Sequence, residues 1–483
     1  MSISISASVY PFLSSVEAST KPIVAVKITP APMSSAKRRR FHLAMLLDVS
    51  GSMDGDRITA MRRTLNLLVD ALAEDDILTL ITYNSAASVR ADCVVIAPDT
   101  RTTLHDTVNS FLADGGTNVE AAIGTLLVLA ADPAKPNVDA VFILTDGHNN
   151  AGMTSSVGLL RLLQNQMNQG VPINTLGYGA DHNSRLLRDM ALRSNGSYTY
   201  ADAAEVLPAI IGDIMGGLEA EVGRLGKLSI PAGWNCLELQ TVPASSGGYC
   251  VGTLIAEKSQ WIVLEGDAGA SSIPPMVFTW KDSSGADQSQ TIALGMDIPM
   301  LEIVEQHERC RVAACFAAVM EDVERYNLDD ARAKLRELAA ELASSFAKDT
   351  TFVIRLQAQV DDMLESLKPI ETFPASPGGL TRSPAGWFGA GGAPSVAPVV
   401  SRLASNTTVL VNQRGFLSAT ASGVASRHVA APALFSSPSQ RSASNRMAAA
   451  YSQTGETTAT EPTEPTVTES VETSPENDSS ESA

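Results

Sequence analysis

The sequence has few cysteines, few aromatic residues and a shortage of positive charge. Its 483 residues include 5 Cys, and aromatic residues make up 5%. An odd number of cysteines without any Cys-x-x-Cys pair excludes a disulfide framework and a zinc site built from cysteine pairs. Lys and Arg number 35 against 53 acidic residues, and the resulting net charge of −18 argues against nucleic acid or anionic membranes as partners.

Long hydrophobic runs are also missing. The amino terminus, Met1 to Val16, is apolar and Ser-rich and contains no basic segment of the kind that begins a signal peptide. No run approaches the roughly 20 apolar residues that a membrane-spanning helix needs. These absences predict an intracellular, cytoplasmic protein without a signal peptide or a transmembrane segment.

One apolar run, Leu43 to Leu47, is followed by an acid and two hydroxyls, which are Asp48, Ser50 and Ser52. The run is typical of a buried strand, and apolar residues at helical spacing follow from Ile58 to Leu72. The three oxygen-bearing side chains therefore lie on a strand-to-helix loop, at the edge where open α/β sheets bind ligands. Carboxylate and hydroxyl oxygens suit Mg²⁺ or Mn²⁺.

The Asp-x-Ser-x-Ser spacing of Asp48, Ser50 and Ser52 resembles the metal-ion-dependent adhesion site (MIDAS) of the von Willebrand factor A (vWA) family. That resemblance implies two further contributors from other loops, and Thr117 and Asp146 match them. It implies that Ser50, Ser52 and Thr117 touch one divalent cation, Mg²⁺ or Mn²⁺. Asp48 and Asp146 would hold the cation mostly through water, and a carboxylate of a partner protein would complete its coordination.

Two other interpretations of these loops remain open. Ser and Asp are favoured at helix N-caps, and each loop precedes a helical pattern, so the same residues could be caps. His148 could serve as a base, but no Ser or Cys nucleophile is paired with it in the sequence. We favour the metal site, because three loops match the family in order. The loops around Gly51, Gly116 and Gly147 are then the expected partner-binding surface.

The patterns along the chain predict an α/β fold with four further regions around it. The expected core is a doubly wound, mostly parallel, six-stranded sheet of the vWA, Rossmann-like type, inserted in an antiparallel β-sandwich. Ile23 to Ile28 alternates as a half-buried strand does and is expected to pair with that sandwich. The predicted regions are 1–33 (N-terminal strands of the sandwich), 41–222 (vWA domain), 225–298 (β-sandwich), 299–368 (helical region) and 369–483 (tail).

The tail is rich in Ser, Thr, Ala and Pro and has an acidic end. Such a composition buries too little apolar surface to offset the entropy of ordering, so the whole of 369–483 is predicted to be disordered.

A narrower resemblance concerns the order of the regions. Ser246 to Tyr249, Val251 to Glu257 and Asn327 to Asp329 are similar to segments of the plant RING-type zinc-finger proteins that carry a vWA domain. In that group a β-rich and a helical region follow the vWA domain, as predicted here. A RING needs eight paired Cys and His ligands, which this chain lacks, so ligase activity is not carried over.

Three functions are compatible with these observations. The first is a non-enzymatic scaffold or adhesion protein whose metal site captures an acidic residue of a partner protein. The alternative is a substrate-recognition adaptor in a ubiquitin-ligase-related assembly. A metal-dependent hydrolase ranks last, because the sequence offers no base in a fixed position beside the metal.

Overall fold

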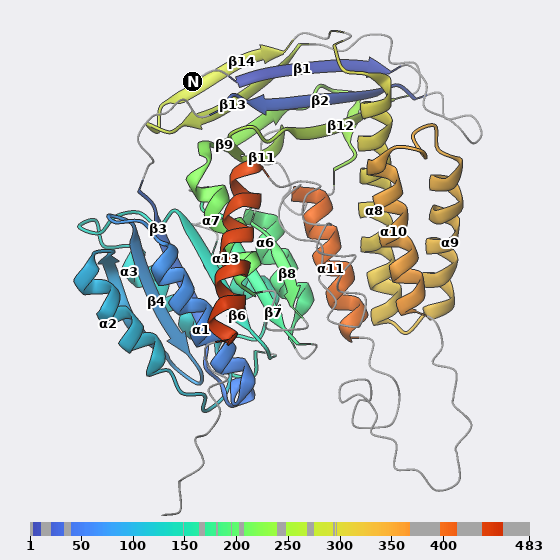
Figure 1. The fold of residues 1–483 in the computed structure, drawn as a ribbon. Helices are drawn as coiled ribbons and strands as arrows, with labels where there is room; N and C mark the ends of the chain where they lie inside the picture. Colours follow the sequence, from blue (N-terminus) through green and yellow to red (C-terminus); the bar gives the residue numbers. More distant parts are fainter. Residues whose placement is uncertain are drawn as a thin grey trace, which may run out of the picture.

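The structure is a computed structural model that describes most of the chain. The described residues are 3–10, 21–32, 40–147, 149–163, 170–179, 182–194, 196–201, 207–238, 248–267, 275–292, 295, 297–367, 397–412 and 437–456. Within them an α/β domain, a pair of antiparallel sheets and a group of helices lie against one another (Figure 1).

The α/β domain contains a six-stranded sheet with the order β5-β4-β3-β6-β7-β8. All neighbours are parallel except β4 and β5, which form an antiparallel hairpin at one edge. Every residue of β3, β4 and β6 is buried, as expected for strands covered by helices on both faces. The predicted α/β fold class is therefore confirmed. The strands are β3 (His42–Asp48), β4 (Ile77–Tyr83), β5 (Ala87–Val95), β6 (Ala140–Thr145), β7 (Ile173–Tyr178) and β8 (Tyr198–Ala201).

Helices cover both faces of this sheet, and successive residues of β3 point to opposite sides. Met45 and Leu47 join the apolar cluster that includes side chains of α1, α2 and α7, while Ala44 and Leu46 join the cluster of α3, α4 and α6. The elements are η1 (Gly51–Met53), α1 (Asp56–Ala71), α2 (Pro98–Asn109), α3 (Val119–Ala130), α4 (Ser156–Leu162), α6 (Ser184–Ser194) and α7 (Leu207–Glu219).

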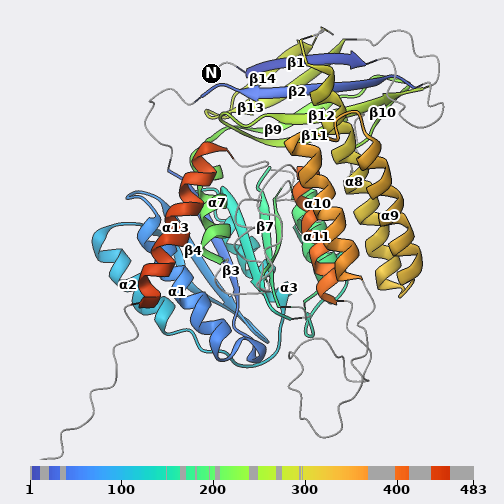
Figure 2. The same ribbon diagram turned by 45° about the vertical axis from the view of Figure 1, so that its right-hand side comes forward.

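Two four-stranded antiparallel sheets, with the orders β1-β2-β12-β10 and β11-β9-β13-β14, lie above the α/β domain in Figures 1 and 2. Val26 of β2 pairs with Ile262 of β12, so the strand that precedes the α/β domain lies inside the first sheet. The chain leaves the sheets after β2 and returns at β9, directly after α7. The strands are β1 (Ile3–Tyr10), β2 (Ile23–Pro30), β9 (Glu221–Ser229), β10 (Trp234–Cys236), β11 (Gly248–Ile255), β12 (Gln260–Gly266), β13 (Met276–Asp282) and β14 (Asp287–Ile292).

A helical group follows the sheets and packs beside the α/β domain. It contains α8 (Met300–Glu324), α9 (Leu328–Ser344), α10 (Thr351–Ser366) and α11 (Ala397–Asn412). Arg309 of α8 is fully buried and pairs with the buried Glu238, with 2.9 Å between Nη1 and Oε2. The same Nη1 donates to the carbonyl of Leu410 in α11, so one guanidinium joins three segments of the chain. No described helix is both long enough and apolar enough to cross a membrane.

The prediction that 369–483 is disordered throughout is wrong for two segments. Residues 397–412 form α11 and residues 438–456 form α13 (Pro438–Glu456); the other residues of the predicted tail lie outside the described part, apart from Ser437. In α11 the apolar residues recur at helical spacing, and Val399, Leu403 and Leu410 are buried. Composition concealed this helix, because its apolar residues are diluted by long stretches of Ser, Ala and Gly on either side.

The second segment, α13, packs along α7 (Figures 1 and 2) through very small residues. A Cβ added to Gly216 of α7 would lie 2.6 Å from the Cα of Gln440, and one added to Gly212 would lie 2.7 Å from the carbonyl oxygen of Ala443. The two backbones therefore approach more closely than any larger side chain at these positions permits. Met447 and Tyr451, further along α13, join the core of the α/β domain.

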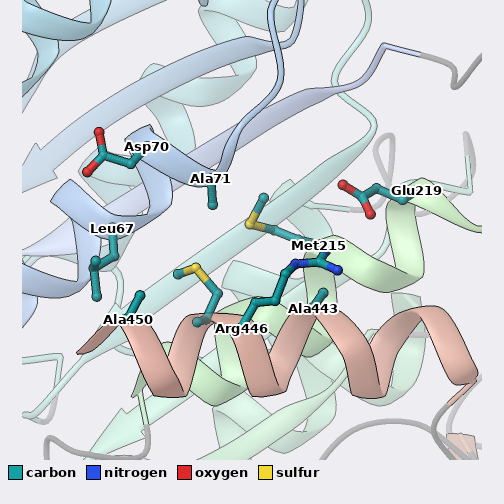
Figure 3. A pocket seen from close by; sticks show the side chains of 9 residues that line it. Leu67, Asp70, Ala71, Met215, Glu219, Ala443, Arg446 and Ala450 are labelled. Carbon is teal, nitrogen blue, oxygen red and sulfur yellow. The ribbon is translucent and has the colours of Figure 1, made fainter. Parts of the chain in front are cut away.

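A cavity of about 270 Å³ remains between α1, α7 and α13. Figure 3 shows Leu67 of α1, Met215 of α7 and Ala450 of α13 around it. Beside it, the guanidinium of Arg63 in α1 lies 3.8 Å from the ring centre of Tyr451. The carboxy-terminal helix is thus held against both α1 and α7.

Candidate metal site

The ends of two adjacent parallel strands bring the two predicted acidic residues together. Leu47 pairs with Leu144, so β3 and β6 end side by side, with Asp48 the last residue of one and Asp146 directly after the other. The third loop joins them through a hydrogen bond of 3.0 Å from the Gly51 amide to the carbonyl of Gly115. The three predicted loops therefore meet at one edge of the sheet.

A chain of hydrogen bonds connects the side chains of the first and second loops. Oδ1 of Asp48 accepts from the Ser50 amide at 2.8 Å, and Oδ2 accepts from the Thr145 hydroxyl at 2.6 Å. The hydroxyls of Ser50 and Ser52 are 3.1 Å apart, and Ser52 donates to Oδ1 of Asp146 at 2.7 Å. Four of the five predicted site residues thus form one connected polar group.

Thr117, the fifth predicted residue, reaches the same place from the loop before α3. Its amide donates to Oδ1 of Asn150 at 2.8 Å, which fixes the loop against the one that follows β6. A Cβ built on Gly147 would lie 3.5 Å from the Thr117 hydroxyl and 3.7 Å from the Ser52 hydroxyl. The two hydroxyls therefore flank a space that the absence of a side chain at Gly147 leaves open.

The helix-cap interpretation does not explain the first loop. Ser50 precedes η1, but its side chain makes no capping hydrogen bond, and the residue before α1 is Gly55. In the loop before α3 it is Asn118 that caps the helix, by accepting from the Ala121 amide at 3.0 Å. The hydroxyls of Ser50 and Ser52 face the acidic residues instead of helix amides.

Both carboxylates are buried, and burial has an electrostatic cost. Asp48 and Asp146 are fully shielded from solvent, and Ser50 and Thr117 are 2% and 3% exposed. Burial, with a smaller contribution from the nearby charge of Asp146, raises the pKa of Asp48 to about 6, although hydrogen bonds from Thr145 and Ser50 favour its charged form. Two carboxylates in such a site are stabilised by a neighbouring positive charge.

The donor set fits a small, hard divalent cation. Two carboxylates and three hydroxyls converge, and oxygen ligands of this kind suit Mg²⁺ or Mn²⁺. Across the described ranges, no cluster of three or more His, Cys, Asp or Glu could hold a metal. The candidate set at this edge of the sheet instead combines two carboxylates with three hydroxyls.

Several residues that build the candidate site carry little or no signal in the sequence. Thr145 holds Asp48, Asn150 holds the Thr117 loop, and the guanidinium of Arg57 pairs with Asp146. Thr145 and Asn150 lie close to Asp146 in the chain, so their position in the sequence could have indicated that they belong to the candidate site. Arg57 carries no such signal, because a basic residue in the first turn of a surface helix normally faces solvent. His148, considered as a base, lies outside the described residues.

Comparisons with known proteins agree with this architecture. Residues 42–212 match the family model of the von Willebrand factor type A domain. The uncharacterized protein YfbK of Escherichia coli is 29% identical over 164 residues, which is 33% of this chain and 28% of that protein. Inter-alpha-trypsin inhibitor heavy chain H1 of Bos taurus is 23% identical over 173 residues, 34% of this chain and 19% of its own length. The chain thus spans less than a third of each of these two relatives.

Solved structures extend the likeness beyond residues 42–212. A von Willebrand factor type A protein from Catenulispora acidiphila superposes with a TM-score of 0.56 at 16% identity, covering 76% of this chain and 88% of that chain. The ArnB paralog VWA2 from Sulfolobus acidocaldarius gives 0.51 at 13% identity, covering 84% and 98%. At these identities the likeness concerns the fold alone, and its coverage shows that parts outside the six-stranded sheet are shared.

Proposed function

Residues 42–212 form a von Willebrand factor type A domain, and we propose that it is a metal-dependent protein-binding module that captures an acidic residue of a partner protein. The observation that carries this proposal is the convergence of three hydroxyls and two buried carboxylates at one edge of the sheet. A cation held there would offer its positive charge to a carboxylate on another protein.

In this proposal each predicted residue has a defined role. The hydroxyls of Ser50, Ser52 and Thr117 contact the cation, and Asp48 and Asp146 hold it mostly through water. Ser52 is the exposed member of the set, so the site opens toward solvent on its side. Glycines at the rim, including Gly51 and Gly147, leave room for a partner's loop or side chain to approach.

A binding role is favoured over a catalytic one, because both carboxylates of the site are already engaged in hydrogen bonds or an ion pair. A hydrolase needs a general base that can reach a water molecule next to the cation. Asp48 accepts hydrogen bonds from Ser50 and Thr145, and Asp146 accepts from Ser52 and pairs with Arg57. Both carboxylates are committed to positioning neighbouring groups, which suits a rigid binding site.

Calorimetry with Mg²⁺ and Mn²⁺ tests the metal site directly. We expect the chain to bind one divalent ion, and Ser50→Ala with Ser52→Ala to abolish that binding without unfolding the protein, because both residues lie on a loop. Ser155→Ala is the matched control, since Ser155 caps α4 and lies outside the site. Unchanged metal affinity in the double variant would refute the assignment.

Protein capture tests the second half of the proposal. The wild-type chain with Mg²⁺ is compared with the wild-type chain in EDTA and with the Ser50→Ala, Ser52→Ala variant in Mg²⁺. Partners that bind through the metal are retained only in the first condition. Replacement of a partner's contacting Asp or Glu by Asn or Gln should then release it. A ubiquitin ligase among the retained proteins would favour the adaptor alternative.

A further inference from the structure

Arg57, in the first turn of α1, directs its guanidinium into the site. Its Nη1 pairs with Oδ2 of Asp146 and lies 3.4 Å from the carbonyl oxygen of Ser52. The guanidinium carbon is 5.6 Å from the ring centre of Tyr178, at the end of β7. The side chain of Arg57 is 33% exposed, whereas that of Asp146 is fully buried. A partly exposed cation therefore covers a buried anion that is predicted to hold the metal.

We propose that Arg57 is a resident counter-cation that competes with the divalent ion for Asp146 and so sets the affinity of the metal site. This inference rests on the proposed function, because it presupposes that the site takes a divalent cation. It assigns to Arg57 a role that is separate from the metal contacts: it occupies a carboxylate oxygen when the ion is absent.

The hydrogen-bond pattern supports competition. Oδ1 of Asp146 accepts from Ser52, and Oδ2 pairs with Arg57, so both oxygens are engaged in this structure. A divalent ion that approaches Ser52 and Asp146 adds two positive charges close to the guanidinium. Charges of the same sign repel at this range, and burial weakens the screening by solvent. Metal binding must therefore displace the guanidinium, or the repulsion between the two cations lowers the affinity for the metal.

The surroundings allow Arg57 to move without disturbing the core. One-third of its side chain is exposed, so solvent can accept the charge when the pair with Asp146 breaks. The guanidinium already lies beside the ring of Tyr178, and this cation–π contact does not depend on the pair with Asp146. A Cβ on Gly179 would lie 3.2 Å from Nη2 of Arg57, so the guanidinium also packs against the backbone there.

Competition and a purely structural ion pair predict opposite results. If the pair only stabilised the loop, removal of the charge would lower stability and leave metal affinity unchanged or weaker. If Arg57 competes, removal of the charge strengthens metal binding. Stability then falls only in the absence of metal, because the ion replaces the lost cation beside Asp146.

The experiment measures Mn²⁺ affinity and melting temperature for the full chain and three variants. Arg57→Gln removes the charge and Arg57→Lys keeps it. Arg62→Gln is the control: it also removes one positive charge from α1, but Arg62 contacts the Phe111 carbonyl and not Asp146. We expect Arg57→Gln to bind Mn²⁺ about tenfold more tightly, which corresponds to about 1.4 kcal/mol. Arg57→Lys and Arg62→Gln should bind like the wild type. In EDTA the melting temperature of Arg57→Gln should fall below that of the wild type, and saturating Mn²⁺ should close the gap.

Each alternative outcome has a distinct meaning. Unchanged or weaker Mn²⁺ affinity in Arg57→Gln overturns the inference, and the proposed function survives if Ser50→Ala with Ser52→Ala still abolishes binding. If the wild type binds no Mn²⁺, the proposed function fails and the inference fails with it. Arg57→Gln is prepared in Mn²⁺, where the inference predicts normal folding, so failure to fold under that condition also overturns it.

Discussion

The candidate metal-site loops and the contact between α7 and α13 both involve the α/β domain, yet they are built in opposite ways. The loops depend on what their side chains offer: the carboxylates of Asp48 and Asp146 are linked through the hydroxyls of Ser50 and Ser52. The helix contact depends on the absence of side chains: Gly212 and Gly216 have no Cβ, so the backbone of α13 can touch α7. The first arrangement gathers polar groups into a candidate metal site, and the second creates a dense interface.

The two regions also differ in their effect on stability. Burial of Asp48 with a raised pKa makes its charged form costly, so the site reduces the stability of the metal-free protein near neutral pH. The contact with α13 buries Met447 and Tyr451 and increases stability. Binding sites commonly carry such a cost while packed interfaces elsewhere offset it. Three changes would break or sharpen this comparison.

Removal of α13 should have the largest effect. A chain that ends at residue 436 exposes the apolar surface that Met447 and Tyr451 cover on α1 and α7. Burial of each large apolar side chain contributes about 1.5–3 kcal/mol, so we expect the free energy of unfolding to fall by about 3–6 kcal/mol. Urea denaturation followed by circular dichroism measures this change.

The matched control is a chain that ends at Glu456, which retains α13 in full. Its stability should equal that of the complete chain. If the chain that ends at residue 436 is equally stable, α13 adds nothing to the fold, and the contrast between the two regions is lost.

Asp48→Asn should stabilise the metal-free protein, and the gain should depend on pH. The folded-state pKa of Asp48 is about 6, above the reference value of 3.8, so the folded state binds more protons than the unfolded state between these values. The stability of the wild type therefore falls as pH rises through this window, and Asn does not titrate. An increase of about 2 in pKa corresponds to about 3 kcal/mol in full. Because pH 4 already lies above the reference value of 3.8, the stability gain of the variant should be about 2 kcal/mol larger at pH 7.5 than at pH 4.

This measurement is made in EDTA by chemical denaturation at both pH values, and then repeated at pH 7.5 with Mn²⁺. Asn should remove the dependence of stability on Mn²⁺, because a charged group of the site is lost. A gain that is the same at both pH values would show that burial of the Asp48 charge is not its cause.

Much of the fold and site could be predicted because their signals are local. The apolar runs that end at Asp48 and before Asp146 mark strands, and the oxygen-bearing residues beside their ends mark the edge at which the structure brings the candidate site residues together. The alternation of Val24, Val26 and Ile28 indicates a strand with one buried face, and this strand pairs with β12. In each case the residues that form the pattern are also the residues that make the contact.

The features that escaped prediction depend on partners far away in the chain. Arg57 reads as an ordinary surface cation until the fold places it beside Asp146. Arg309 and Glu238 form a buried ion pair between segments that no sequence spacing relates. The Ser and Ala content of α13 predicts disorder. The glycines against which α13 packs lie on α7, far away in the sequence, so no local pattern in α13 indicates this contact. Tertiary contact, rather than local propensity, determines these elements.

The smallest predicted effect compares two helical glycines and has opposite signs at the two positions. A Cβ on Gly216 would lie 2.6 Å from Gln440 of α13, so Gly216→Ala forces the helices apart and should cost about 1–3 kcal/mol. A Cβ on Gly124 of α3 meets nothing within 4 Å, so Gly124→Ala should instead stabilise by about 0.5–1 kcal/mol through the better helix propensity of alanine. Both variants are measured by urea denaturation at one pH in EDTA.

In the chain that ends at residue 436, Gly216→Ala should lose its penalty and become stabilising like Gly124→Ala, since α13 is no longer present to clash with the new methyl group. A penalty that persists without α13 would place the constraint within α7 itself and remove close helix approach as the reason for glycine at this position.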